Sequence, residues 1–582
     1  MPILQPIANV AELLYQKGIT DVVISPGSRS APLTMAVARH PGLKTRVVAD
    51  ERSAGFIALG MAMQSRRTVA VICTSGSAVY NLAPAVAEAY FQEVPLLLLT
   101  ADRPHEWLHQ QDGQTMAQAG VFGPHVKRSF DLPADYTHAD ARWFIERSVN
   151  EAINLCGLSP AGPVHINVPL REPFYPLEGE TMTFEQVRII ETLPMMQQLP
   201  PATWHQLLDE WESTERKLIA VGQVPYDPAL LAVLHKISDE FGVPVIGELT
   251  GNIGHNSLFI SHSDTLLGGS EEAFLDSLRP ELLLTFGGSF LTRNLKTFFR
   301  QHPVGMPNHN RHWRISPAVD RIVDPFCSLT TLVPMAPLPF LEKLFADMDY
   351  QRFRQGDDDS DESFDFRERW QQADRRATVM VQQSLQESDF TDWAATKAVM
   401  DALPTDSVLH LANSMPVRYA NLCGIPADRR VAVSANRGVS GIDGCLSTAV
   451  GAALQTDQFV TVLIGDVAFF YDRNALWHAQ LPKNLRIVLL NNHAGHIFRI
   501  IDGPNRQPEL AEFFETEQPL TAQRTAEDAR ISYLFCDNQS DVEQALSGFY
   551  VVQDKAVLLE IRTDKLVNER EFGVYKARVR GL

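Results

Sequence analysis

Short apolar runs of strand length alternate with longer segments of helical period along almost the whole chain, and this alternation constrains the fold more than any other feature. In the N-terminal part, turn residues or charges bound each run. The strand-like runs there are Asp21–Ser25, Arg46–Ala49, Val69–Cys73, Pro95–Thr100 and Val164–Val168. The helical segments between them are Ile7–Gln16, Ala31–Arg39, Ala54–Gln64 and Ala78–Phe91. Strands that alternate with helices of this length predict a parallel sheet with helices on both faces.

The same alternation returns twice, so we predict an α/β protein with three α/β domains, each a parallel sheet flanked by helices. A chain of 582 residues has room for roughly three or four domains. The predicted boundaries are 1–180 for the N-terminal domain, 195–345 for a central domain, 351–384 for a charged linker and 385–582 for the C-terminal domain. Within the linker, we expect the acidic run Asp357–Glu362 to be solvated. The later strand-like runs are Leu218–Val221, Pro244–Ile246, Leu282–Phe286, Ser407–Leu411, Arg430–Val433, Val460–Ile464, Arg486–Leu490 and Ala556–Ile561.

The balance of charges limits the ligands that the chain can bind. With 51 Lys and Arg against 70 Asp and Glu, the formal net charge is −19, which argues against nonspecific binding of nucleic acid or of anionic membranes. An acidic substrate would need a local cluster of arginines to overcome this field. The six cysteines show no metal-binding spacing. We see no signal peptide and no apolar run near the ~20 residues of a membrane span, so we expect a cytoplasmic protein.

The strongest local signal lies in the third region, where polar side chains follow two predicted strands. Gly465 and Asp466 come directly after the strand Val460–Ile464, and Asn492 follows the strand Arg486–Leu490. The carboxyl ends of parallel strands meet at one edge of a sheet, where open α/β folds bind their ligands. Carboxylate and amide oxygens suit a hard cation such as Mg²⁺. Taken alone, however, these are also ordinary turn residues after strands.

The spacing and flanks of these residues resemble the motif with which thiamine-diphosphate enzymes bind a metal ion and the cofactor diphosphate. The resemblance implies thiamine diphosphate and Mg²⁺ as cofactors, with Mn²⁺ able to replace Mg²⁺. It also implies Asp466, Asn492 and the carbonyl oxygen of Ala494 as the metal ligands. Val467 and Ala494 depart from the pattern, because many members have glycine at the first position and glycine is common at the second. A backbone carbonyl ligand does not require glycine.

The N-terminal region then carries the residues expected at the pyrimidine end of the cofactor. Glu51 opens the helical segment after the strand Arg46–Ala49, and in the enzymes it resembles such a glutamate donates a hydrogen bond to the aminopyrimidine ring. Thr74, Ser75 and Gly76 match a loop that approaches the cofactor. On the residues alone, Glu51 is more simply an acid that favours the helix dipole, and the loop is a helix-capping turn.

Three longer strings narrow the resemblance: Ser25–Leu33, Thr100–Pro104 and Asn436–Gly444. With them the whole chain resembles, in order, the 2-succinyl-5-enolpyruvyl-6-hydroxy-3-cyclohexene-1-carboxylate synthase family of menaquinone biosynthesis. The resemblance implies pyrimidine-binding, central and diphosphate-binding domains, and a homodimer or tetramer with active sites between chains. It also implies a transferase that decarboxylates 2-oxoglutarate and adds the succinyl group to isochorismate.

Both implied substrates are dicarboxylates, which bidentate guanidinium groups recognise better than flexible lysines do. The family pattern places Arg293 where the family has a basic pair, but its neighbour here is Asn294. Any single arginine is more simply the partner of a surface ion pair. The residues implied for the substrate pocket are Ser28, Arg29, Arg103, Gln114, Arg293, Ser414, Arg418 and Arg437, and those implied for catalysis are Glu51, Gln114 and Arg29.

Further cofactor contacts are implied for Gly465 and for Ser440, Ile442, Ile497 and Phe498. Ile442 is the candidate bulky residue that keeps the cofactor bent. Ile497 and Phe498 are equally consistent with ordinary packing at the start of a helix.

The sequence is also compatible with two other functions. One is a thiamine enzyme with a different 2-oxo acid, such as a pyruvate-using synthase or a simple decarboxylase, which needs fewer cationic groups in its pocket. The other is a non-catalytic protein on the same fold. The presence of Glu51, Asp466 and Asn492 argues against the second alternative.

Overall fold

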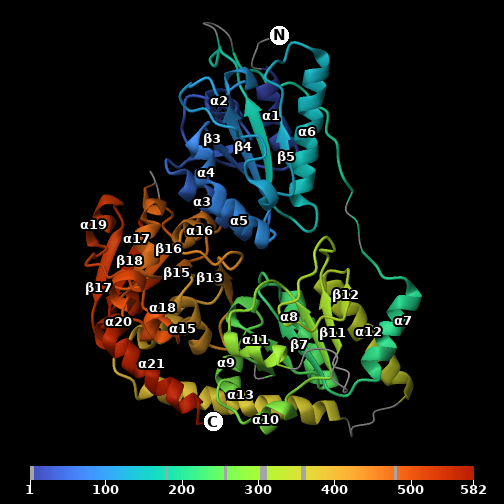
Figure 1. Ribbon diagram of the computed structural model, residues 1–582, viewed down its shortest axis with the longest axis vertical. Helices are drawn as coiled ribbons and strands as arrows, with labels where there is room; N and C mark the ends of the chain where they lie inside the picture. Colours follow the sequence, from blue (N-terminus) through green and yellow to red (C-terminus); the bar gives the residue numbers. More distant parts are fainter. Residues whose placement is uncertain are drawn as a thin grey trace.

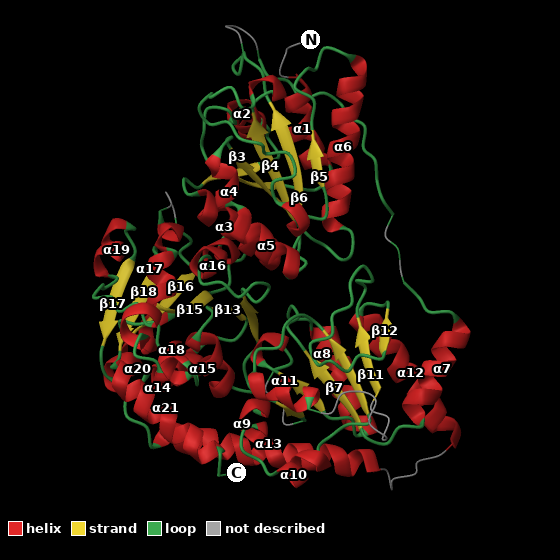
Figure 2. Cartoon of the chain, viewed as in Figure 1, coloured by secondary structure: helices red, strands yellow, loops and turns green. Residues whose placement is uncertain are grey.

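Three separate six-stranded sheets, each parallel throughout, organise the chain (Figure 1). The computed structural model describes residues 5–176, 181–193, 195, 197–254, 258–301, 311–355, 362–477 and 481–581. Helices cover both faces of each sheet (Figure 2), so the predicted α/β fold class is confirmed. Each strand predicted from the sequence is present, with its ends displaced by at most two residues.

The N-terminal sheet has the strand order β2-β1-β3-β4-β6-β5. Its core strands β3 and β4 are buried at every position, in keeping with the apolar sequence of β3 and of the first four residues of β4. The strands are β1 (Asp21–Ile24), β2 (Lys44–Val47), β3 (Val69–Cys73), β4 (Leu96–Asp102), β5 (Ser129–Asp131) and β6 (Val164–Pro169). The helices are α1 (Gln5–Gln16), α2 (Ala31–Arg39), α3 (Glu51–Ser65), α4 (Ser77–Asn81), α5 (Ala83–Phe91) and α6 (Ala139–Gly157).

The central sheet has the order β12-β11-β10-β7-β8-β9. Its strands are β7 (Lys217–Val221), β8 (Val245–Gly247), β9 (Phe259–Ile260), β10 (Leu282–Phe286), β11 (Arg311–Ile315) and β12 (Thr331–Val333). Its helices are α7 (Pro201–Glu212), α8 (Pro228–Phe241), α9 (Ser263–Leu267), α10 (Glu272–Ser277), α11 (Arg293–Arg300) and α12 (Pro337–Gln355).

The C-terminal sheet has the order β14-β13-β15-β16-β18-β17, which repeats the topology of the N-terminal sheet strand for strand. Its strands are β13 (Ser407–Leu411), β14 (Val431–Ala435), β15 (Val460–Gly465), β16 (Leu485–Asn491), β17 (Ser532–Cys536) and β18 (Val557–Arg562). Its helices are α14 (Asp392–Ala402), α15 (Met415–Cys423), α16 (Cys445–Ala453), α17 (Asp466–Tyr471), α18 (Ile497–Ile500), α19 (Gln523–Asp528), α20 (Gln539–Phe549) and α21 (Lys565–Val579).

The charged segment between the second and third sheets is largely helical. Helix α13 (Glu362–Gln386) runs beneath the central and C-terminal units (Figure 1). It buries Phe366, Trp370 and Ala377 in the apolar core of the central unit, so one face of this charged sequence packs while the other stays in water. Of the acidic run, residues 357–361 lie outside the described part of the chain.

The N-terminal and C-terminal units meet where α3 crosses α16. A Cβ on Gly60 would lie 1.9 Å from the carbonyl oxygen of Thr448, and a Cβ on Gly451 would lie 2.0 Å from that of Ile57. Glycine at both positions lets the two backbones touch. Side chains of both units share one apolar core there. Among the described residues, no helix combines the length and the apolar composition that crossing a bilayer requires.

Candidate active site

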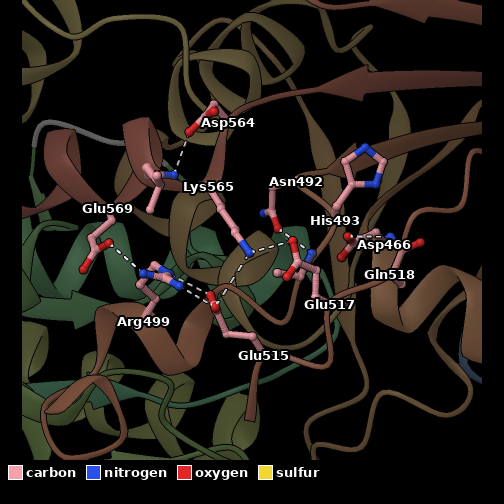
Figure 3. Close-up of polar contacts among 12 residues, drawn as sticks. Asp466, Asn492, His493, Arg499, Glu515, Glu517, Gln518, Asp564, Lys565 and Glu569 are labelled. Atoms are coloured by element: carbon pink, nitrogen blue, oxygen red, sulfur yellow. Dashed lines mark hydrogen bonds and ion pairs between the residues drawn. The ribbon is translucent and has the colours of Figure 1, made fainter. Parts of the chain in front are cut away.

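Asp466 is a buried carboxylate at the carboxyl end of β15. One of its oxygens accepts from the backbone N–H of Val467 at 2.7 Å, and the other accepts from the side-chain amide of Gln518 at 3.0 Å (Figure 3). Burial raises the pKa of Asp466 to about 7, against the lowering effect of these donors. No basic side chain of the described chain forms an ion pair with Asp466. A buried carboxylate without a cationic partner is one that a bound metal ion would stabilise.

Asn492 follows the neighbouring strand, because β15 and β16 pair in register up to Gly465 and Leu490. The backbone N–H of Ala494 donates to the side-chain oxygen of Asn492 at 3.1 Å and also lowers the pKa of Asp466. Ala494 therefore lies beside both side chains. The backbone φ of Ala494 is not positive, whereas His493 has a φ of 63°, so the turn places its left-handed residue before Ala494 and needs no glycine at 494.

The amide of Asn492 is oriented by a residue from a distant part of the chain. Its nitrogen donates to Asp392 at 2.7 Å. The other oxygen of Asp392 accepts from the hydroxyl of Thr563 at 2.6 Å, and the backbone N–H of Asp392 donates to Asn568 at 2.9 Å. The side-chain oxygen of Asn492 is thus the atom left for a metal.

A second segment, Glu515–Gln518, braces the loop that carries Ala494. The backbone N–H of Gly495 donates to the carbonyl oxygen of Glu515 at 2.6 Å. The backbone N–H of Gln518 donates to the carbonyl oxygen of His493 at 3.0 Å. The fully buried Glu515 accepts a two-pronged contact from Arg499, at 2.7 and 2.5 Å (Figure 3). This hydrogen bonding raises the pKa of Arg499, so its guanidinium stays charged, and the loop is fixed on both sides of Ala494.

The donor set suits Mg²⁺ more than a softer metal. In the described chain, no three His, Cys, Asp or Glu side chains come together as a metal site would bring them. Asp466, Asn492 and Ala494 instead offer one carboxylate, one amide and one carbonyl oxygen. Mg²⁺ is typically held by few protein oxygens and by phosphates and water, so these residues fit a metal bound together with a diphosphate.

The N-terminal loops of the predicted site are locked to one another. Ser75 donates its hydroxyl to the carbonyl oxygen of Gln114 at 2.8 Å, and Gly76 donates its N–H to the buried side chain of Gln118 at 2.7 Å. Gly76 has a φ of 85°, and a Cβ there would lie 3.1 Å from the backbone of Gln114. Thr74 is buried with its hydroxyl unpaired and touches Gly27 in the loop that carries Ser28, which is exposed.

Glu51 is the first residue of α3, but it is not the helix cap. Asp50 caps the helix by accepting from the N–H groups of Arg52 and Ser53. Within the described part of the chain, the carboxylate of Glu51 accepts a single hydrogen bond, a long one of 3.4 Å from Asn81. Among the described residues, no hydrogen bond joins Glu51 to the residues around Asp466 within one chain.

Arg29 and Arg103 lie near each other at the carboxyl edge of the N-terminal sheet. Burial lowers the pKa of Arg29, and the charge of Arg103 lowers it further. Arg29 stacks on the ring of Phe174 at 4.5 Å, and Arg103 pairs with Asp112 at 2.8 Å. Glu172, Asp102 and Asp112 act in the opposite direction and raise the pKa of Arg29, so a bound anion would add to an attraction that these acids already supply in part.

Arg418 and Arg437 form a second cationic pair, in the C-terminal unit. Burial lowers the pKa of Arg418, and the charge of Arg437 adds to the effect. The Nε atom of Arg437 is buried without a hydrogen-bond partner. Ser414 has a φ of 75° and a ψ of −131°, a conformation that costs energy in any residue other than glycine and is concentrated at functional sites.

The remaining predicted positions are more scattered. Arg293 is exposed at the start of α11. Ser440 has a φ of 66°, and Ile442 packs against the core shared by the N-terminal and C-terminal units. Phe498 lies at 5.8 Å, ring to ring, from Phe514.

The sequence did not point to three residues that lie at or near the site: Asp392, Gln518 and Lys296. Asp392 and Gln518 are far in the sequence from the side chains that they contact, Asn492 and Asp466, so no local motif marks them.

Lys296 lies one turn beyond Arg293. Burial lowers the pKa of Lys296, Glu248 raises it, and the charges of Arg437 and Arg418 lower it further.

The site therefore falls into two halves within one chain. The C-terminal unit gathers Asp466 and the loop of residues 492–495, which we call the metal loop after its proposed role, together with the Arg418–Arg437 pair. The N-terminal unit gathers Glu51, the Ser75 loop and the Arg29–Arg103 pair.

Comparison with known proteins supplies relatives for the whole chain. A family model described as thiamine pyrophosphate enzyme, N-terminal TPP binding domain, matches residues 8–121. A protein of Cytophaga hutchinsonii is 42% identical over 577 residues, which cover 99% of each chain. A protein of Flavobacterium johnsoniae is 35% identical over 562 residues, which cover 96% of each chain. A protein of Desulfotalea psychrophila is also 35% identical, over 563 residues that cover 96% of this chain and 98% of the relative. All three relatives are named 2-succinyl-5-enolpyruvyl-6-hydroxy-3-cyclohexene-1-carboxylate synthase.

Proposed function

The chain belongs to the 2-succinyl-5-enolpyruvyl-6-hydroxy-3-cyclohexene-1-carboxylate synthase family of thiamine-diphosphate transferases, and we propose that it transfers a succinyl group from 2-oxoglutarate to isochorismate in menaquinone biosynthesis. The observation that carries the proposal is the position of Asp466 and Asn492 at the ends of the paired strands β15 and β16. Two separate arginine pairs support two carboxylate-bearing substrates.

The C-terminal unit would hold the metal and the diphosphate. Asp466, Asn492 and the carbonyl oxygen of Ala494 would bind Mg²⁺, or Mn²⁺ in its place. Asp392 and Gln518 keep the two side-chain ligands oriented, which is the usual role of residues behind a metal site. The residues proposed to line the rest of the cofactor site are Thr74, Ser75, Gly76, Ser440, Ile442, Gly465, Ile497 and Phe498.

Thiamine diphosphate supplies the stabilisation of negative charge at the acyl carbon after carbon dioxide leaves. The residues of this chain supply placement and proton control. Glu51 would donate a hydrogen bond to the pyrimidine ring. Ile442 would press on the cofactor from the side of the α3–α16 core, against which it packs.

A second copy of the chain would complete the site. No hydrogen bond joins Glu51 to the metal loop of its own chain among the described residues, and Tyr80, which precedes the Asn81 that bonds Glu51, has a side chain that is 59% exposed. An exposed aromatic side chain beside a catalytic group fits a surface that a partner covers. We propose a cytoplasmic homodimer or tetramer, with domains 1–180, 195–345 and 385–582 and with the linker 351–384 between the second and the third.

Each arginine pair would bind a different substrate. Ser414, Arg418 and Arg437 would hold the distal carboxylate of 2-oxoglutarate, because they lie in the same unit as the metal loop. Arg29 and Arg103, with Ser28 and Gln114, would face isochorismate from the N-terminal unit of the partner. Arg293 would add one charge from the central unit.

The proposal is tested by supplying the purified protein with thiamine diphosphate, Mg²⁺, isochorismate and either 2-oxoglutarate or pyruvate. Product formation is followed by mass spectrometry. A product with the mass of the succinylated cyclohexene, formed only with 2-oxoglutarate and isochorismate together, supports the proposal. Turnover of pyruvate alone would favour the rival decarboxylase function, and no turnover of either acid would favour a non-catalytic role.

A further inference from the structure

Glu88, on α5 of the N-terminal unit, reaches into the C-terminal unit of the same chain. Its side chain is buried, with 2% exposed. One carboxylate oxygen accepts from the backbone N–H of Gly438 and the other from that of Val439, both at 2.7 Å. Two consecutive N–H groups that converge on one carboxylate fix a loop in both position and direction.

The burial of this carboxylate makes its contacts necessary. Desolvation raises the pKa of Glu88, and the hydrogen bonds from Val439, Gly438 and Gln92 lower it. A buried carboxylate that lost these donors would carry a large desolvation cost. The loop therefore has one strongly preferred place against α5.

The backbone of α5 also contacts the loop. A Cβ on Gly438 would lie 2.8 Å from the carbonyl oxygen of Glu88. Any other residue at 438 would push the loop away from the helix, so glycine is needed for close approach here.

A hydrogen-bond chain extends from Glu88 to the central unit. Gln92, one turn further along the helix, donates to Glu88 at 2.5 Å. Gln223 then donates to Gln92 at 3.0 Å and to the carbonyl oxygen of Ala435 at 2.9 Å. All three units thus meet at the start of this loop.

The loop carries three residues of the candidate site: Arg437, Ser440 and Ile442. From its other side, Asn413 donates to the carbonyl oxygens of Asn436 and Gly441, both at 2.7 Å, and accepts from Arg437 at 3.0 Å. The loop is therefore held between Asn413 and Glu88, and only the second of these holds it from another unit.

We propose that Glu88 is a positioning residue of the active site, which sets the 436–444 loop so that Arg437 meets the distal carboxylate of the 2-oxo acid. This inference rests on the proposed function. Glu88 touches neither substrate nor cofactor; it acts through the two N–H groups beside Arg437.

The test compares wild-type protein with Glu88→Gln. A glutamine offers one acceptor oxygen and turns an N–H donor toward one of the two loop N–H groups. We expect the KM for 2-oxoglutarate to rise roughly tenfold or more. Binding of the unreactive analogue 2-hydroxyglutarate, measured by calorimetry with Mg²⁺ and thiamine diphosphate present, should weaken by a similar factor.

Glu93→Gln is the matched control. Glu93 lies just beyond α5 and also reaches another unit, where it pairs with Arg321 at 3.1 Å, but it does not touch the loop. Its KM and analogue affinity should stay at the wild-type values. Glu88→Asp, which keeps the charge but shortens the reach, provides the comparison if the glutamine variant does not fold.

A double variant separates positioning from general stability. Gly438→Ala should give the same rise in KM, and the Glu88→Gln, Gly438→Ala double variant should be little worse than either alone, because both displace one loop. A lowered melting temperature with wild-type KM and analogue affinity would overturn the inference. Absence of turnover in the wild-type protein would instead overturn the proposed function.

Discussion

The side-chain amide of Asn492 donates a 2.7 Å hydrogen bond to the buried carboxylate of Asp392. Asp392 begins α14, a hundred positions before Asn492 in the chain, and is itself tied to Thr563 and Asn568 near the start of α21. Since a carboxylate only accepts, the amide nitrogen must face Asp392 and the amide oxygen must face away from it. The geometry of the proposed metal site therefore depends on a residue that is not a ligand.

Asp392→Ala should weaken Mg²⁺ binding without abolishing it. Removing a residue behind a metal ligand typically lowers metal affinity by about 10–100-fold. The measurement is the Mg²⁺ dependence of thiamine diphosphate binding, followed by calorimetry. Asp389→Ala, which removes an exposed carboxylate paired with Arg570, is the control and should bind as the wild type does. Equal Mg²⁺ affinities in the two variants would show that Asp392 does not support the metal site.

The crossing of α3 and α16 predicts a large effect on stability. Gly60→Ala would place a methyl group 1.9 Å from a backbone oxygen, and overpacking of this kind costs about 1–3 kcal/mol or more. Gly548→Ala, in a helix where a Cβ meets nothing within 4 Å, should be neutral or stabilising by up to about 1 kcal/mol. Urea denaturation monitored by circular dichroism gives both values. A Gly60→Ala protein as stable as the wild type would mean that the two helices are further apart.

Glu51→Gln should fold and bind the cofactor but be nearly inactive. The cap of α3 is Asp50, so the substitution leaves the helix start intact, while an amide presents the wrong proton to the pyrimidine ring. Exchange of the C2 proton of bound thiamine diphosphate, measured by NMR in deuterated water, reports this role directly. Exchange at the wild-type rate would show that Glu51 serves only as an acid in the first helical turn.

Decarboxylation and addition should be separable by mutation. Losing a charge-assisted contact to a carboxylate costs about 1.5–3 kcal/mol. Arg103→Ala should therefore raise the KM for isochorismate by roughly ten- to a hundredfold and leave carbon dioxide release from 2-oxoglutarate in a single turnover almost unchanged.

Arg418→Ala should do the reverse and slow carbon dioxide release itself. Arg430→Ala, which removes an exposed arginine paired with Asp406, is the control for both. Equal damage to carbon dioxide release from Arg103→Ala and Arg418→Ala would mean that the arginines act as one electrostatic field.

Most of the strands that the sequence predicted are largely apolar, such as β3 and β10, because parallel strands buried on both faces are apolar. Of the strands that it missed, β5, β9 and β12 span only two or three residues, and β11 has no apolar run. β11 reads Arg-His-Trp-Arg-Ile and is nevertheless buried at four of its five positions. His312 is accommodated there because its ring nitrogens bond to Thr285 and Ser328 at 2.8 and 2.9 Å, partners that no local pattern reveals.

The residues of the candidate site also fall into those that the sequence reveals and those that only the structure reveals. Asp466 and Asn492 stand out because each directly follows a recognisable strand, and the topology brings strand ends together. Asp392, Gln518 and Glu88 act through contacts with residues far away in the sequence. Their roles depend on how the units pack, which composition and periodicity do not encode.

Binding of thiamine diphosphate to the Asp466→Ala protein tests whether Asp466 is a ligand of the metal that holds the cofactor. Calorimetric titrations with and without Mg²⁺ would compare this variant with the wild type and with Asp457→Ala, which changes an exposed aspartate in the same unit. We predict Mg²⁺-dependent binding in the wild type and in Asp457→Ala, and loss of that binding in Asp466→Ala, because the one charged ligand proposed for the metal is gone. Unchanged affinity of Asp466→Ala for thiamine diphosphate would contradict this prediction.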